Sequence, residues 1–167
     1  MSNQPHHQSQ FRLSLRELFL GVLFVAMAIV SLLYASPAWQ VVTGLFVLLV
    51  FIGAIIGVIV DRGSRQSFAI GMSVAMTVYA TAIIYARVGS NFNTEFMSDN
   101  ARVRLPTTRL LRSFYAAIVD RTEILGEREF RGTVVGTTEI PDGSAFMWVG
   151  HAWWALLFGY FGGRFAA

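Results

Sequence analysis

The sequence predicts an all-α integral membrane protein with about four transmembrane helices. Apolar residues make up 54% of the chain and charged residues only 14%, whereas a soluble domain usually carries about 25% charged residues. Several apolar stretches have the length needed to cross a bilayer, about 20 residues of helix. One long polar segment, residues 89–144, lies between the last two of these stretches. We therefore expect one membrane domain over residues 11–163, with an extramembrane α+β-like insert.

Composition also narrows the chemistry that the chain can perform. The chain has no cysteine, and all of its basic residues are arginine. Disulfides, thiolate metal sites, cysteine nucleophiles and Schiff-base lysines are therefore excluded. The net charge is only +3 and no basic run occurs, so we expect no nucleic-acid partner.

Residues 1–10 are polar and without periodicity, which predicts a disordered tail. The tail contains His6 and His7. Two adjacent histidines without further ligands favour a plain tail over a metal site. No metal or cofactor is predicted anywhere in the chain.

The first span is predicted over residues 18–35, after an amphipathic turn that carries Arg12 and Arg16. Its long apolar run, followed at once by another, favours an uncleaved signal-anchor. Cleavage after Ala38 is the alternative and would leave three spans. The remaining spans are predicted over residues 39–60, 67–88 and 145–163, and residues 164–167 form a C-terminal tail.

The insert is predicted to contain a helix from about Pro106 to Arg121, because a threonine pair follows the proline and can accept amide hydrogen bonds. Gly126 is expected to end any continuation, and one or two short strands are expected within residues 130–140. The helix is expected to lie on the outer membrane surface or on a partner. Three carboxylates, at Glu123, Glu127 and Glu129, alternate with arginines, which favours a salt-bridged surface over a metal or acid–base site.

Arginine placement predicts the orientation. Arg12 and Arg16 precede the first span, whereas the turn after it carries no charge. The positive-inside rule therefore puts both termini in the cytoplasm. Residues 89–144 would then be periplasmic or extracellular.

Small residues mark the faces through which the spans should pack, since they let helix backbones approach closely in lipid. The second span has a GxxxG pair, Gly53 and Gly57, and the third has a small face that starts at Gly71. The fourth carries a stripe made of Trp148, His151, Ala152, Ala155, Gly159, Gly162 and Gly163. Its other side, with Val149, Trp153, Trp154, Leu156, Leu157, Tyr160 and Phe161, is expected to face lipid or a bulky neighbour. Spacing leaves open whether these contacts form within one chain or between copies.

His151 is the one ionisable residue well inside a predicted span. Such residues are functional candidates because burying them is costly. No acidic residue lies within a predicted span to orient this imidazole, as catalysis would require. An interhelical hydrogen bond is therefore favoured, with Tyr79, Thr77, Thr81 or a backbone carbonyl as the partner.

Two stretches carry a resemblance to a known group of proteins. The segment FRLSLREL, residues 11–18, opens the first span, and VGHAWWALL, residues 149–157, is followed by Gly162 and Gly163. Together they resemble the small multi-pass membrane proteins of planctomycetes, with an FSLRELL-like start and a GHxxxALL…GG final helix. The resemblance implies an inner-membrane protein with the long insert in the periplasm. It assigns no activity to His151.

Packing signals without a catalytic constellation favour a non-enzymatic accessory, scaffold or assembly subunit of a larger membrane complex. Its expected partners are the lipid bilayer and either other membrane proteins or further copies of itself. The alternative is a small oligomeric transporter or channel that uses His151. A membrane enzyme is disfavoured, because no nucleophile–base pair or ligand set is found.

Overall fold

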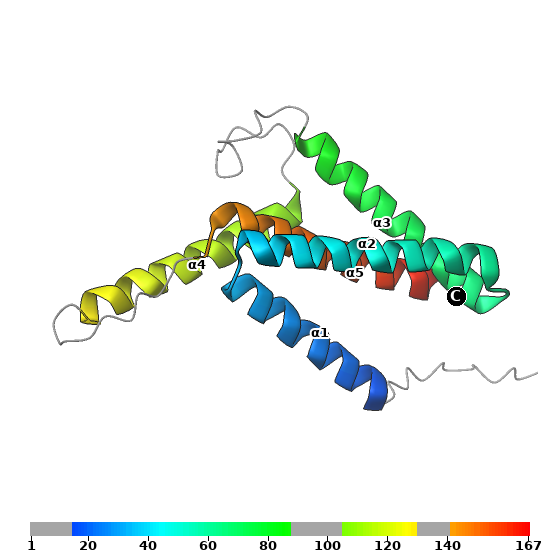
Figure 1. The fold of residues 1–167 in the computed structure, drawn as a ribbon, viewed down its shortest axis with the longest axis horizontal. Coiled ribbons are helices and arrows are strands. Elements are labelled where there is room, and N and C mark those ends of the chain that lie inside the picture. The colour runs from blue at the N-terminus through cyan, green and yellow to red at the C-terminus, as the bar shows by residue number, and fades with distance from the viewer. Residues whose placement is uncertain (1–14, 88–104, 130–140) are drawn as a thin grey trace, which may run out of the picture.

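A computed structural model describes residues 15–87, 105–129 and 141–167. These residues form five helices and, within the described ranges, no strand. The helices are α1 (Leu15–Leu33), α2 (Pro37–Val60), α3 (Ser64–Arg87), α4 (Pro106–Glu129) and α5 (Gly143–Ala166) (Figure 1). The short strands expected within residues 130–140, and the tail over residues 1–10, lie outside the described residues.

The helix α5 lies at the centre of the bundle. It contacts each of the other four helices and packs most extensively against α3. It runs parallel to α2 and antiparallel to α1, α3 and α4, so the α2–α3 turn and the end of α5 share one end of the bundle (Figure 1). The opposite end holds the α1–α2 turn and the start of α5 (Figure 1). We call these the turn end and the crossover end.

Three of the described helices are long and apolar enough to cross a membrane: Leu15–Leu33, Pro37–Val60 and Ser64–Ala86. They correspond to the first three predicted spans, shifted by a few residues. The helix α5 is not among them, because glycines, Trp and Tyr residues and a histidine lower its hydropathy. Length and composition thus support three spans rather than four. The helix also continues to Ala166, so most of the predicted C-terminal tail is helical.

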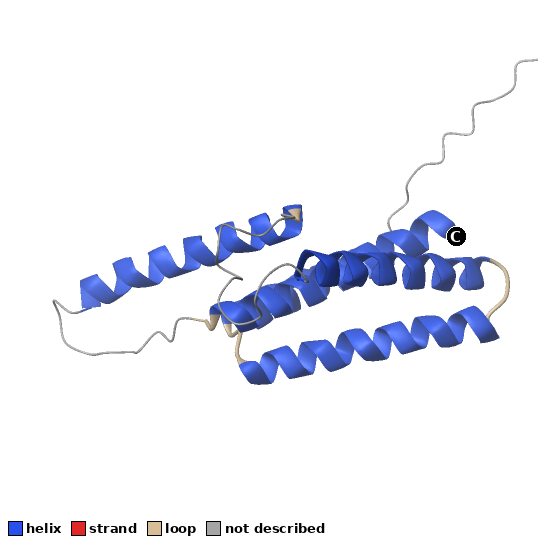
Figure 2. Ribbon diagram, turned by 90° about the horizontal axis from the view of Figure 1, so that it is seen from above, coloured by secondary structure: helices blue, strands red, loops and turns tan. Residues whose placement is uncertain are grey.

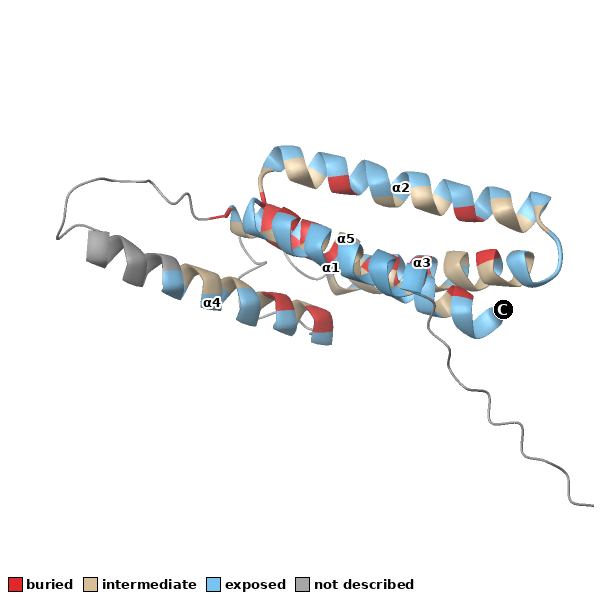
Figure 3. Ribbon diagram, turned by 90° about the horizontal axis from the view of Figure 1, so that it is seen from below, coloured by how far each residue is buried: buried red, intermediate tan, exposed pale blue. Residues whose placement is uncertain are grey.

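The distribution of buried residues agrees with the central position of α5. Most of α2 is exposed or half-buried, and the buried positions gather on α5 and on the surfaces that face it (Figure 3). The bulky side of α5 was expected to face lipid or a bulky neighbour, and at Val149 and Leu156, which are 0% and 6% exposed, it is covered by neighbouring helices. Four helices contact α5, so packing is not confined to the side that carries the small residues. Exposed leucine, isoleucine and valine side chains on α1 and α2 instead form the surface that lipid would cover.

The insert helix differs from its predicted form. The helix α4 begins at Pro106 as expected but runs through Gly126 to Glu129, so Gly126 does not end it. One interior glycine costs a helix only about 1 kcal/mol, and Glu, Leu and Arg around it favour helix. Figure 2 shows α4 extending past the crossover end of the bundle.

Candidate functional site

His151 lies at the centre of a buried polar cluster that joins three helices. Its side chain is 5% exposed, and it stands eight residues into α5, about 12 Å along the helix from Gly143. The Nδ1 atom lies 2.9 Å from the Tyr79 hydroxyl on α3. The Nε2 atom lies 3.3 Å from the Thr108 hydroxyl on α4. Tyr79 also donates to the Thr107 hydroxyl at 3.1 Å.

The bond between His151 and Tyr79 is one of those that the sequence predicted. The other two predicted hydroxyl partners point elsewhere, since Thr77 donates to the Ser73 carbonyl and Thr81 to the Thr77 carbonyl of their own helix. Tyr79 is itself buried, so a phenol and an imidazole meet where neither is solvated. A hydrogen bond between two such groups avoids the cost of leaving either one unsatisfied.

The first turn of α4 supplies the remaining hydroxyls. Pro106 suits the first helical position, because its fixed φ matches the helix and its missing amide proton is not needed there. The sequence predicted that the threonines after it would cap the helix. Instead Thr107, which is buried, accepts from Tyr79, and Thr108 lies against His151. The first turn of α4 therefore docks on the interior of the bundle.

An apolar layer seals this cluster on the side of the crossover end. Leu111, one turn beyond Thr107, is buried and packs over Gly150, where an added Cβ would meet Leu111 Cδ2 at 2.3 Å. Leu111 belongs to a cluster with Ala35, Ala145, Phe146 and Met147. Tyr115 extends the contact: its ring lies 5.2 Å from that of Phe146, and its hydroxyl donates to the Pro141 carbonyl at 3.1 Å.

A second polar contact, which the sequence analysis missed, attaches α1 to α5. The Trp153 indole donates to the Ser31 hydroxyl at 2.7 Å, and Ser31 donates to the Ala28 carbonyl at 3.0 Å. The Phe24 ring meets the same indole edge-on at 4.8 Å. Trp153 is on the side that was expected to face lipid or a bulky neighbour, and it is half-buried. The available signal was Ser31, a hydroxyl within an otherwise apolar span.

The glycines singled out in the sequence lie in two different settings. Gly71 lies against the backbone of Gly162, since a Cβ on Gly71 would stand 2.3 Å from the Gly162 carbonyl oxygen. Gly159 and Gly163 face Met76 and Phe68 of α3. These contacts form within one chain. By contrast, a Cβ on Gly53 would meet nothing within 4 Å, and one on Gly57 would lie 3.1 Å from Ala69 Cβ.

The geometry around His151 is that of a junction at which α3, α4 and α5 meet. Both ring nitrogens lie within hydrogen-bond distance of hydroxyl groups, and the ring is shielded from water. In the described ranges, no three histidine or acidic side chains come together in a way that could hold a metal ion. The side chains of Glu123, Glu127 and Glu129 lie outside what the structure describes.

Comparison with protein-family models, curated proteins and solved structures gives no match.

Proposed function

We propose that this protein is a non-enzymatic membrane scaffold that holds α4 as a docking arm for another membrane protein. The observation that carries the proposal is the way α4 is held. Its first turns are fixed to α3 and α5 through Thr107, Thr108 and Leu111, while the rest of the helix extends past the crossover end (Figure 2).

The proposal takes α5 as a fourth span. Its 24 residues give about 36 Å of helix, enough for a hydrocarbon core of about 30 Å. A helix surrounded by α1, α2 and α3 does not need a strongly apolar sequence, because protein covers much of its surface. The side chains of His151 and Trp153 are also hydrogen-bonded inside the bundle, as the membrane interior requires of polar groups.

The orientation of the scaffold is inferred from the charges that flank the first span. Arg16 is in the first turn of α1, whereas the α1–α2 turn carries no charge. The positive-inside rule then assigns the start of α1 to the cytoplasm, together with the turn end, where Arg62, Arg65 and Arg164 lie. The arm α4 then lies on the periplasmic or extracellular side of a cell inner membrane, which agrees with the resemblance to planctomycete membrane proteins.

The arm keeps an exposed surface suited to a partner. Leu110 and Phe114, one helical turn apart, are 47% and 61% exposed. Ala117 and Arg121 continue the same side and are also exposed. An apolar strip that ends in charge is typical of helices that bind in a groove of another protein.

Photo-crosslinking in the native membrane tests the proposal. A photoreactive amino acid at Ala117 is expected to capture one protein species, in a fixed ratio to this chain. The same group at Leu49, on the exposed surface of α2, serves as the control and should capture lipid only. No protein adduct from Ala117, together with solute or proton flux in liposomes that His151→Ala abolishes, would instead establish the transporter alternative.

A further inference from the structure

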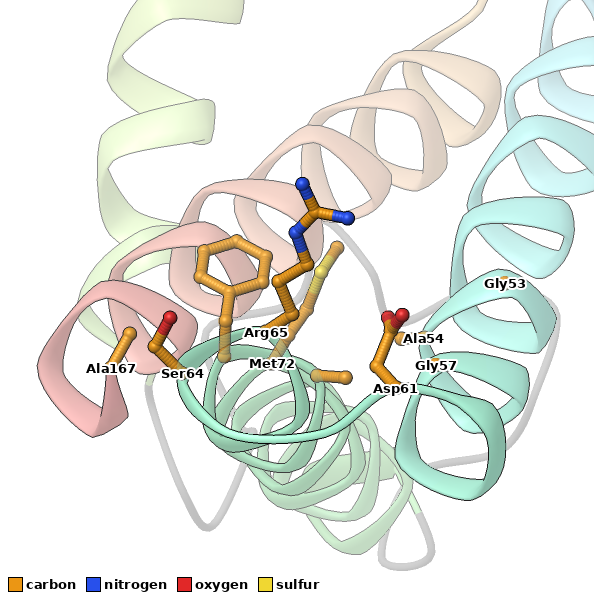
Figure 4. A pocket seen from close by; sticks show the side chains of 10 residues that line it. Gly53, Ala54, Gly57, Asp61, Ser64, Arg65, Met72 and Ala167 are labelled. Atoms are coloured by element: carbon orange, nitrogen blue, oxygen red, sulfur yellow. The ribbon is translucent and has the colours of Figure 1, made fainter.

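A hollow of about 440 Å³ lies at the turn end, between α2, α3 and the end of α5 (Figure 4). Its volume falls within the range of small-molecule sites, about 300–1,000 Å³. Gly53 and Gly57 border it from α2, and Phe68 and Met72 border it from α3. Of the predicted GxxxG pair on α2, Gly53 therefore borders open space, whereas Gly57 packs closely against Ala69 of α3.

Two opposite charges stand at the mouth of this hollow. Asp61 ends α2, and Arg65 lies in the first turn of α3. Figure 4 shows the carboxylate and the guanidinium reaching the space from the two helices. Gly57 makes room for the carboxylate, because a Cβ there would stand 3.2 Å from Asp61 Oδ2.

The length of the hollow along α2 is close to the thickness of the hydrocarbon part of one membrane leaflet. From Asp61 to Gly53 it follows α2 for eight residues, about 12 Å. Half of the hydrocarbon core is about 15 Å thick. The charged mouth is at the turn end, where Arg62 and Arg164 also lie. The part of the hollow lined by glycines extends from there toward the membrane centre.

We propose that this hollow binds one phospholipid whose headgroup carries both a phosphate and a primary ammonium, of the phosphatidylethanolamine class. The phosphate binds Arg65, whose planar guanidinium suits bidentate contact with phosphate oxygens. The ammonium binds Asp61. One acyl chain lies along Gly53 and Gly57, against Phe68 and Met72.

A second copy of the chain fits the hollow less well. In a two-fold dimer with its axis at the hollow, one hollow would face another and neither would be filled. The two charges at the mouth also match a zwitterionic headgroup better than an anionic one, which would leave Asp61 opposed to a like charge.

Native mass spectrometry of the full chain, released from nanodiscs with equal amounts of phosphatidylethanolamine, phosphatidylcholine and phosphatidylglycerol, tests the assignment. One phosphatidylethanolamine should be retained in preference to the others. Arg65→Gln and Asp61→Asn should each reduce its retention by roughly tenfold, the effect of one lost charge-assisted hydrogen bond. Arg62→Gln, an exposed charge in the same turn that does not line the hollow, should leave it unchanged.

A second pair of variants tests the acyl-chain position. A Cβ added at Gly53 meets nothing within 4 Å, so the side chain of Gly53→Leu is expected to enter the hollow and to expel the lipid. Gly44→Leu, on the same helix with equal free space but outside the hollow, should retain it. Equal lipid retention by Gly53→Leu and the parent chain would overturn the proposal. A preference for phosphatidylglycerol that Asp61→Asn leaves unchanged would also overturn it. The same holds if the chain forms a dimer that Gly53→Leu dissociates while the amount of bound lipid stays the same.

Discussion

His151 connects three helices through a single imidazole ring. Tyr79 on α3 and Thr108 on α4 bind its two nitrogens, and each bond replaces one that water would supply outside the membrane. Interhelical hydrogen bonds of this kind contribute about 0.6 kcal/mol on average and at most about 1.7 kcal/mol. The larger penalty comes from leaving a buried polar group without a partner.

Replacing His151 is expected to weaken the fold rather than only remove a reactive group. His151→Ala should lower the free energy of unfolding in detergent by about 1–3 kcal/mol, since it leaves the Tyr79 hydroxyl without the ring and opens a cavity. Tyr79→Phe, which removes only the hydroxyl, should cost about 1 kcal/mol. A double-mutant cycle measures the coupling, and strictly additive losses would show that the two side chains do not interact.

Asp142 caps the start of α5 and makes the stability of the protein depend on pH. The backbone amide of Ser144, then its hydroxyl, lower the pKa of Asp142, with the Ala145 amide contributing further. A carboxyl whose pKa is lowered on folding stabilises the protein above its unfolded pKa. That contribution is lost as the pH falls through the folded pKa.

The stability of the bundle should therefore decline below about pH 4, the unfolded value for aspartate. Asp142→Ala should destabilise the protein by about 1 kcal/mol at neutral pH and flatten this acid dependence. Asp142→Asn keeps a capping group without the titration. Thermal unfolding at several pH values compares the three, and an unchanged acid profile in both variants would contradict the capping role.

At the scale of helices, the contact between α3 and α5 depends on the absence of side chains. Gly71 and Gly162 bring the two backbones together, and no side-chain rotation can relieve a methyl group placed there. At Gly150 the nearest atoms belong to the end of the flexible Leu111 side chain, which can shift. Replacement by alanine should therefore change the stability of the bundle by different amounts at these glycines.

Gly71→Ala is expected to destabilise the bundle by about 1–3 kcal/mol, the usual cost of overpacking. Gly150→Ala should cost less. Gly44→Ala should be neutral or stabilising by up to about 1 kcal/mol, because alanine favours helix and the site is open. Denaturant unfolding in one detergent ranks the three. If Gly44→Ala lowered the free energy of unfolding as much as Gly71→Ala, helix packing would not be what determines the cost of these substitutions.

The elements that the sequence predicted well are those with a local signal. Long apolar runs mark α1, α2 and α3, and small-residue spacing identifies Gly71, Gly159 and Gly163 as positions of close approach. The docking of α4 had no such signal. Thr107 and Thr108 were interpreted as a helix cap, because nothing near them in the chain indicates Tyr79 or His151 as partners.

At the scale of the whole molecule, the residue pattern of a single helix does not predict which of its faces are buried when several other helices surround it. For the bulky side of α5 the pattern left lipid and a bulky neighbour both open, and in the structure Val149 and Leu156 are buried and Trp153 binds Ser31. The sequence of α5 shows which residues are small. It does not show that α1, α2, α3 and α4 would all pack on it. Its modest hydropathy is a consequence of this central position.

The central claim is that α5 crosses the membrane as the fourth span, with α4 on the side opposite the C-terminus. Because the chain lacks cysteine, single cysteines at the exposed positions Ser64, Asp120 and Ala167 report their side of the membrane to an impermeant maleimide. The account predicts that Ser64→Cys and Ala167→Cys react from one side and Asp120→Cys from the other. Labelling of Ala167→Cys from the same side as Asp120→Cys would mean that α5 does not cross, and would contradict the account.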